Sequence, residues 1–332
     1  MMDEQVKKSL IEKIESLGLR SYGFMKVKML TSSEEYFRKR LELGFQTTFE
    51  ESEISRKIDL SSEMPSGKTI VSIAFPYHFN VEISKEGYFS MYTLGKDYHI
   101  VLMEYLEEIA KVLRNHGYEA KCFADNNSLP ERYIAYVSGV GEIGRNHMLI
   151  TKEYGSKVFL GEIITNLEME TEEKDFEEIE NYEVCGTCRN CIKACPTQIL
   201  GHVYYDTHRC MSYITQSKEV SDEDLKLFKG RLFGCDTCQL VCPLNKDLKT
   251  SPLMAFEPRD YMKHPKLENL VKLSNEEFKN YKETSAGWRG KKLLQRNAMI
   301  ELMRKGRKID ETSLGTVYLK SYYHRLTDVF KL

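Results

Sequence analysis

Eight of the nine cysteines fall at spacings that are typical of iron–sulfur ligation. The first group, Cys185-x2-Cys188-x2-Cys191-x3-Cys195-Pro, is the full run of bacterial ferredoxins. In that run the first three thiolates bind one 4Fe–4S cubane, and the fourth, followed by proline, binds the other. The spacing therefore predicts two clusters with crossed ligation.

A second group, Cys235-x2-Cys238-x3-Cys242-Pro, lacks its leading cysteine, and Cys210 upstream is the replacement we expect. The crossed pattern divides the eight thiolates into two sets. Cluster one takes Cys185, Cys188, Cys191 and Cys242, and cluster two takes Cys210, Cys235, Cys238 and Cys195.

Other uses of these cysteines explain the pattern less well. Zinc favours four ligands in two C-x2-C pairs, which leaves the x2-x2-x3-Pro spacing unexplained. A disulfide framework is not expected in a reducing cytosol. The ninth cysteine, Cys122, lies in an apolar strand-like segment, where a packing role is expected.

A glycine motif, Gly139-x-Gly141-x-x-Gly144, matches the dinucleotide fingerprint. That fingerprint requires a strand before it and a helix after it, whereas residues 130–138 have a helical pattern. We therefore do not expect a Rossmann site. The glycines instead indicate a tight turn or a backbone that lies flat against a planar cofactor.

Composition favours a cytoplasmic location without a membrane segment. The N-terminus is charged throughout, with no apolar region of the kind that a secretory signal needs. The longest apolar runs, such as Thr69–Phe75, have the length of a strand and cannot span a bilayer. The net charge is −2, but residues 281–332 hold twelve Lys or Arg against five Asp or Glu. This basic segment could contact a phosphate backbone or could be an ordinary solvated face.

Strands alternate with helices up to about residue 167, which indicates an α+β fold. We expect strands at 21–28, 68–77, 118–124 and 157–165, and a hairpin around Glu86–Gly87. Helices are expected from an Asp3 N-cap to Gly18, and at 33–43, 97–115 and 130–138. The last clear helix, at 291–303, has an amphipathic pattern.

The acidic segment at 168–183 is a natural linker, and three domains follow from it. Residues 1–180 form an α/β catalytic domain, residues 181–250 a ferredoxin-like domain with two clusters, and residues 251–332 a short helical region. A free ferredoxin would be far shorter, so the rest of the chain must use the electrons.

Several further segments resemble the epoxyqueuosine reductases, which are cobalamin-dependent enzymes of tRNA modification. The resemblance covers most of the chain. Its segments are Arg56-Lys57-x-Asp59, Met64–Ser72, Gly95-Lys96-Asp97-Tyr98-His99, Asp125 with Glu131, Gly139–Asn146, Gly155-Ser156, Phe159–Ile163, Arg209–Tyr213, Phe233–Gln239 and Arg296-Asn297-Ala298.

The resemblance implies a cobalamin in the N-terminal domain, in a fold like those of nitroreductases and reductive dehalogenases, with electrons supplied by the nearer cluster. The glycine segment and the strand at 155–163 would contact the corrin mainly through backbone atoms. The implied cofactor-binding residues are Tyr98, His99, Gly139, Gly141, Gly144, Arg145, Asn146, Gly155, Ser156 and Gly161. His99 is expected to be a pocket or capping residue and not a cobalt ligand, because it lies at a helix start.

The same resemblance makes Asp125 the proton donor in the reduction of epoxyqueuosine, at the wobble position of tRNA, to queuosine. Opening an epoxide places charge on its oxygen, which a carboxylic acid can neutralise by donating a proton. The alternative is that Asp125 is an ordinary strand-end or cap residue, a role that its Asn-Asn-Ser neighbours would also suit.

The sequence departs from the family at three points. Asn126–Ser128 replaces the usual D-[ST]-[AG]-P continuation, Glu142 replaces an aromatic residue, and Arg145 replaces a lysine. These changes leave the substrate open. The alternatives to epoxyqueuosine reduction are a related cytosolic cobalamin and iron–sulfur reductase of a small molecule, or a non-enzymatic electron carrier. The expected partners are tRNA and a low-potential donor, either ferredoxin or flavodoxin.

Overall fold

The computed structural model describes residues 2–174 and 182–332. Its contacts divide the chain into two units. The first unit contains Met1–His78, His99–Thr207 and Cys238–Met254, and the second contains Phe79–Tyr98, His208–Thr237 and Ala255–Leu332. Both units are therefore assembled from separate stretches of chain, whereas the domain boundaries expected at 180 and 250 describe consecutive blocks. That functional division stays a prediction, and part of its linker, residues 175–181, lies outside the described residues.

A four-stranded antiparallel sheet is the centre of the first unit, with the order β1-β2-β7-β4. Its strands are β1 (Tyr22–Lys26), β2 (Thr69–Pro76), β7 (Val158–Thr165) and β4 (Ala120–Phe123). Every residue of β2 is buried, as expected for a continuous apolar run in the middle of a sheet. All four strands agree with the sequence-based expectation.

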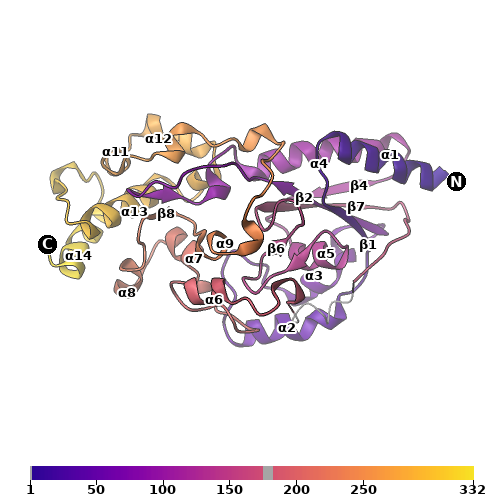
Figure 1. Ribbon diagram of the computed structural model, residues 1–332, viewed down its shortest axis with the longest axis horizontal. Helices are drawn as coiled ribbons and strands as arrows, with labels where there is room; N and C mark the ends of the chain where they lie inside the picture. The colour runs from indigo at the N-terminus through magenta and orange to yellow at the C-terminus, as the bar shows by residue number, and fades with distance from the viewer. Residues whose placement is uncertain (1, 175–181) are drawn as a thin grey trace. The chain divides into compact units, whose positions relative to one another are not determined.

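Helices cover both faces of this sheet (Figure 1). Helices α1 (Met2–Ser16) and α4 (Tyr98–Asn115) lie along one face, and α5 (Glu131–Val137), α3 (Ile54–Ile58) and α2 (Thr31–Glu42) lie on the other. Helix α1 already begins at Met2, so Asp3 lies in its first turn and not at the expected N-cap position. The core on the α5 side includes Ile70, Phe123, Ile134 and Ile164.

Short elements surround the cysteine motifs of the first unit. After α5 the chain forms a small hairpin of β5 (Glu142–Ile143) and β6 (Leu149–Ile150). The helices near the cysteines are η4 (Glu183–Cys185), α6 (Asn190–Ala194), α9 (Thr237–Leu240) and η6 (Pro243–Asn245). The glycine motif thus follows a helix and enters a hairpin, the reverse of the order in a dinucleotide-binding unit. The expectation that it is not a Rossmann site is confirmed.

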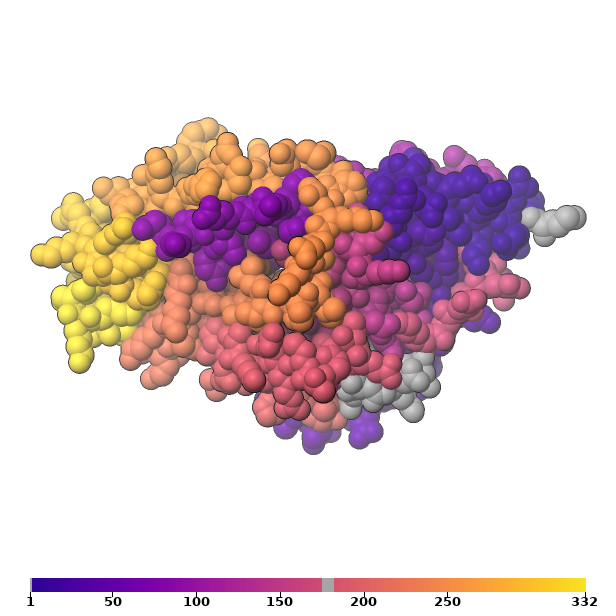
Figure 2. All heavy atoms as spheres, viewed as in Figure 1, coloured from indigo at the N-terminus to yellow at the C-terminus, as the bar shows by residue number. Residues whose placement is uncertain are grey.

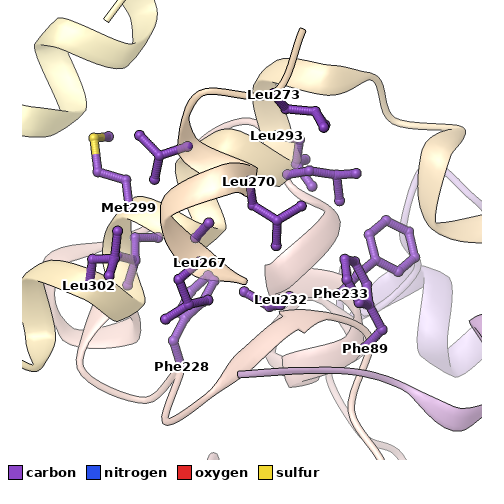
Figure 3. Packing of buried hydrophobic residues seen from close by; sticks show 14 of the residues in the cluster. Phe89, Phe228, Leu232, Phe233, Leu267, Leu270, Leu273, Leu293, Met299 and Leu302 are labelled. Atoms are coloured by element: carbon purple, nitrogen blue, oxygen red, sulfur yellow. The ribbon is translucent and has the colours of Figure 1, made fainter. Parts of the chain in front are cut away.

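Helices dominate the second unit. They are α7 (Met211–Gln216), α8 (Asp222–Leu225), α10 (Asp260–Lys263), α11 (Leu267–Val271), α12 (Asn275–Lys282), α13 (Lys291–Arg304) and α14 (Val317–Phe330). Leucine and phenylalanine side chains from these helices and from β8 (Arg231–Phe233) form a continuous core (Figure 3). The amphipathic interpretation of α13 is wrong, because every residue from Leu293 to Met303 is buried.

The expected hairpin around Glu86–Gly87 is also wrong. Instead β3 (Tyr88–Phe89) pairs in parallel with β8, far away in the sequence. The segment around β3 lies at the surface of the second unit beside the orange residues of its helices (Figure 2). Phe89 contacts Tyr281 there, with ring centroids 5.9 Å apart. No described helix is both long and apolar enough to cross a membrane.

Candidate functional site

The four cysteines assigned to cluster one line a single pocket in the first unit. Cys185, Cys188 and Cys191 reach it from the first motif, and Cys242 reaches it from the second. Burial raises the pKa of the Cys242 thiol, and the nearby Cys185 and Cys188 thiols contribute to the rise. The fold therefore brings together the set that the crossed pattern requires. This arrangement supports the assignment of cluster one.

The cysteines assigned to cluster two are divided between the units. Cys195 and Cys238 belong to the first unit, and Cys210 and Cys235 belong to the second. Cys195 is buried, and the Nε atom of Arg231 donates to the Cys235 sulfur at 3.2 Å. Their joint ligation of cluster two stays a prediction.

Two residues expected at the corrin lie at the cluster-one pocket. Arg145 and Asn146 both line it. The backbone N–H of Arg145 donates to the Cys185 sulfur at 3.4 Å, and its guanidinium donates to the Gly186 carbonyl at 3.0 Å. The buried Arg145 Nε and Asn146 Nδ2 atoms have no hydrogen-bond partner in the described part of the chain. They are donors that cluster sulfides or a neighbouring cofactor can use.

Gly155 and Ser156 hold the segment that follows Cys242. The Ser156 N–H donates to Asn245 Oδ1 at 2.8 Å, and the Ser156 hydroxyl donates to Gln239 Oε1 at 3.0 Å. Gly155 has φ +52°, and a Cβ there would lie 2.1 Å from Asn245 Oδ1. A glycine is therefore needed here, because the turn before β7 lies very close to Asn245, three residues after Cys242.

Protein packing explains most of the other predicted glycine contacts. A Cβ at Gly141 would lie 2.6 Å from the Ile150 carbonyl oxygen, and one at Gly144 would lie 2.6 Å from Ile150 Cδ1. At Gly161 a Cβ would lie 2.9 Å from Leu106 on α4. Only Gly139 among these faces open space, with φ +79°. Contact of these glycines with a corrin stays a prediction.

The loop that contains Asp125 directly follows β4 and precedes α5. Asp125 and Asn126 both have left-handed backbone conformations, with φ of 52° and 48°. Glu131, the first residue of α5, accepts hydrogen bonds from the Asp125 N–H at 2.8 Å and from Asn127 Nδ2 at 3.1 Å. The Asp125 side chain is 49% exposed, so it is accessible for chemistry.

His99 is the second residue of α4, and its Nε2 atom lies 3.3 Å from Asp125 Oδ2. The helix start expected at this point is confirmed, and His99 contacts the predicted proton donor. Tyr98 is the first residue of the same helix and belongs to the second unit. A role of either side chain in cofactor binding stays a prediction.

Beside the Asp125 loop lies a polar cavity of about 210 Å³. Its wall combines loop residues with α5 and the α2–α3 region, including Arg40, Glu50 and Lys57. Arg40 is almost fully buried and pairs with Glu50 at 2.8 Å. Burial opposes the charged form of Glu50, but the Arg40 hydrogen bond and charge lower the Glu50 pKa overall. The cavity wall is therefore a fixed charged framework next to Asp125.

The departures from the family pattern are accommodated locally. Asn127 Oδ1 accepts from the Leu129 N–H at 2.8 Å, and the Ser128 hydroxyl donates to Glu63 Oε1 at 2.7 Å, so the changed residues stabilise the turn themselves. Glu142 forms an ion pair with Lys174. Its charge is therefore neutralised by the protein.

Two family models match the chain. One, described as "Epoxyqueuosine reductase QueG, DUF1730", matches residues 57–126, and the "4Fe-4S double cluster binding domain" matches residues 184–245. The epoxyqueuosine reductase of Bacillus subtilis is 35% identical over 312 residues, which are 90% of this chain and 79% of that protein. The chain belongs to the epoxyqueuosine reductase family. The enzyme of Lactococcus garvieae is also 35% identical, over 89% of this chain and 87% of the relative.

Solved structures of epoxyqueuosine reductases have the same fold. A selenomethionine-labelled enzyme superposes with a TM-score of 0.88 at 31% identity, over 99% of this chain and 91% of that one. An enzyme crystallised with an epoxyqueuosine-modified stem loop of tyrosine tRNA gives a TM-score of 0.86 at 29% identity, over 99% and 100%. In a Bacillus subtilis structure with a TM-score of 0.86, an aspartate catalytic loop is described as swung out of the active site.

One edge of the sheet suits the cofactor of an epoxyqueuosine reductase. Strand β4 pairs only with Glu162–Thr165 of β7, so no described strand pairs with Val158–Gly161 on that side. Phe159 and Leu160 in this stretch are half-exposed, although they lie on a central strand. This edge begins where β4 leads into the Asp125 loop. An open backbone edge with apolar side chains fits a flat macrocycle whose rim bears amide groups, as in cobalamin.

The basic C-terminal segment of this family member is less available to tRNA than its composition indicates. Arg296 is fully buried, and Arg304 pairs with the buried Glu301 at 2.7 Å. Arg307 pairs with Glu86 at 2.9 Å, whereas Lys292 is exposed. Cys122 is half-buried on β4, and burial raises its thiol pKa to about 12, whereas its packing role stays a prediction.

Sequence reasoning missed the roles of Glu131 and Glu162. Glu131 was part of the family pattern, but its hydrogen bonds to the Asp125 loop become visible only in the folded chain. Glu162 is completely buried on β7. A carboxylate inside the apolar run Phe159–Thr165 was the signal that could have identified it.

Proposed function

We propose that this chain reduces epoxyqueuosine, at the wobble position of tRNA, to queuosine. The observation that carries the proposal is the match over its whole described fold to an enzyme solved with an epoxyqueuosine-modified tRNA stem loop. Relatives of the same name at 35% identity support it. The reaction is a reduction by two electrons and two protons, with loss of the epoxide oxygen as water.

The electrons pass through the two 4Fe–4S clusters, with cluster one held by Cys185, Cys188, Cys191 and Cys242. Cobalamin, when bound, supplies the low-potential electron transfer that opens the epoxide. Arg145 and Asn146 line the cluster-one pocket and direct unpartnered donors into its surroundings. A ferredoxin or flavodoxin is the external donor that we propose.

Asp125 donates a proton to the oxygen that leaves the epoxide carbon. Three features support this role: its side chain is half-exposed, it borders the polar cavity, and it follows β4 where the open edge of β7 begins. His99 holds the Asp125 carboxyl at 3.3 Å and so limits its orientation. The cavity is where we place the cyclopentane ring of the substrate.

The tRNA is bound in the cytoplasm, and we propose that exposed lysines of the second unit, such as Lys292, contact its backbone. Such contacts would be sensitive to salt, because binding releases counterions from the phosphates.

Expression in a bacterial strain that lacks epoxyqueuosine reductase tests the function. We expect mass spectrometry of digested tRNA to find queuosine in place of accumulated epoxyqueuosine. An Asp125→Asn variant expressed to the same level should leave epoxyqueuosine in place. If the wild-type chain leaves the epoxide unchanged although it contains both clusters and cobalamin, epoxyqueuosine in tRNA is not its substrate.

A further inference from the structure

Glu131 adds hydrogen bonds from α5 to those that the Asp125 loop makes within itself. Its Oε1 atom accepts one bond from the Asp125 backbone and one from the Asn127 side chain. Two successive residues of that loop, Asp125 and Asn126, have positive φ values. Such conformations cost free energy outside glycine, although Asp and Asn tolerate them best, and they persist when neighbouring contacts fix them. Glu131 supplies two of those contacts, and the loop itself supplies others, from the Asn126 N–H to Asp125 Oδ1 at 2.9 Å and from Asn127 Nδ2 to the Asp125 carbonyl at 2.9 Å.

A second carboxyl group lies behind Glu131 in the core. Glu162 is opposite Ser72 of β2 and Phe123 of β4 in the sheet register. Side chains alternate along a strand, so Glu162 shares its face with Leu160 and Ile164, which pack in the same core as α5. Glu131 is the first residue of that helix. The two carboxyl groups therefore approach each other from the sheet and from the helix that covers it.

The charge on Glu162 is poorly compensated. Ser72 donates to Glu162 Oε1 at 3.2 Å, while the buried Oε2 atom has no partner in the described part of the chain. A buried carboxylate with one weak hydrogen bond is costly, whereas a protonated carboxyl group is not. Burial and then the nearby Glu131 raise the pKa of Glu162 well above its usual range.

The surroundings of Glu131 contain charges of both signs. Arg132 follows it on α5, Asp125 with its partner His99 faces it from the loop, and Glu162 faces it from β7. Four further charged groups border the same cavity from the α2–α3 side, namely Arg40, Glu50, Glu51 and Lys57. Glu50 and Arg40 neutralise each other. The carboxyl group nearest to Glu131 on the loop side is Asp125, and burial together with that charge raises the pKa of Glu131 to about 7.

We infer that Glu131 is the positioning residue of Asp125: its two hydrogen bonds hold the backbone of the loop that carries the proposed proton donor. This inference rests on the proposed role of Asp125 as proton donor. Glu131 therefore keeps the Asp125 backbone in place beside the polar cavity.

Hydrogen–deuterium exchange of the purified chain tests the positioning role. We expect Glu131→Ala to increase amide exchange at Asp125–Asn127 about five- to tenfold through loss of its two hydrogen bonds, while β2 stays protected. Glu131→Gln retains an acceptor oxygen and should preserve the protection. Glu12→Gln, on the exposed surface of α1, is the matched control. Unchanged exchange at this loop in a folded Glu131→Ala protein would overturn the positioning role.

The exchange measurement requires neither tRNA nor cobalamin, so it is independent of whether the chain reduces epoxyqueuosine. In turnover, Glu131→Gln should change the pH profile more than the KM for tRNA.

Discussion

Substitution of Gly155 should damage cluster one while most of the fold is kept. A Cβ at this position would lie 2.1 Å from Asn245 Oδ1 and 2.8 Å from the Leu244 carbonyl oxygen. Asn245 cannot move easily, because its Nδ2 atom donates to the Gln239 carbonyl at 2.8 Å and its N–H donates to the Cys242 carbonyl at 3.0 Å. In Gly155→Ala the segment that contains Cys242 must therefore shift.

The expected cost has two parts. A residue with a side chain in the left-handed conformation costs about 1–2 kcal/mol. Displacement of Asn245 breaks its bonds with Ser156, at about 1 kcal/mol each. Together these two costs should destabilise the cluster-bound protein by about 3–4 kcal/mol.

Iron content and thermal unfolding under anaerobic conditions measure this effect. Gly155→Ala should lose about half of its iron and unfold at a lower temperature. Gly117→Ala is the control, because Gly117 also has a positive φ of 85° but a Cβ there would meet no described atom within 4 Å. It should show the backbone cost alone and keep both clusters. Equal behaviour of the two variants would refute the argument that Gly155 positions the cluster-one ligand.

Four further predictions concern the clusters, the proton donor, the tRNA surface and pH. Cys195→Ala should damage the cluster that we assign to Cys210, and electron paramagnetic resonance that shows loss of the other cluster alone would contradict crossed ligation. Asp125→Asn should keep iron and bound corrinoid but lose most turnover, and retained turnover would return Asp125 to a structural role. Lys291→Glu with Lys292→Glu should weaken tRNA binding several-fold at low salt, and binding that does not respond to salt would argue against these contacts. Burial and then Arg132 lower the pKa of His147 to about 3, so the unfolded chain binds the extra proton below pH 6.5 and the free energy of unfolding should fall by about 2 kcal/mol between pH 6.5 and 4.5. A His147→Phe variant should flatten that slope in urea titrations.

The sequence was most informative where chemistry or burial leaves a local pattern. Ferredoxin spacing predicted a set of four cysteines that the fold places around one pocket, since the ligands of a cubane must follow fixed intervals. The apolar runs of β2 and β7 identified the two central strands of the sheet. The helix pattern before Gly139 was enough to reject a Rossmann site.

Local sequence patterns could not predict the pairing of distant strands or the burial of polar side chains. Strand β3 exists because of its partner β8, and neither segment is long enough to be recognised alone. The polar residues of α13 are spaced as on a solvent-exposed helix face. Arg296 is nevertheless buried, and its guanidinium donates hydrogen bonds to the Ser217 and Lys218 carbonyls. Burial of polar residues cannot be predicted without knowing the partners that satisfy them.

The functions of individual glycines show the same limit. Gly141 and Gly161 were expected to contact a cofactor through their backbone, and the fold adds that a Cβ at either position would meet neighbouring protein atoms. A glycine in a motif indicates that some group comes close to the backbone. The motif alone does not show which group that is, so the corrin contact stays a prediction.

The iron and acid-labile sulfide content of the anaerobically purified wild-type chain tests most directly whether it binds the two clusters that the proposed reduction requires. Two 4Fe–4S clusters predict about eight irons and eight sulfides per chain. About four irons or fewer, in protein that is folded and has all nine cysteines intact, would contradict the central claim that two thiolate-bound clusters supply the reduction.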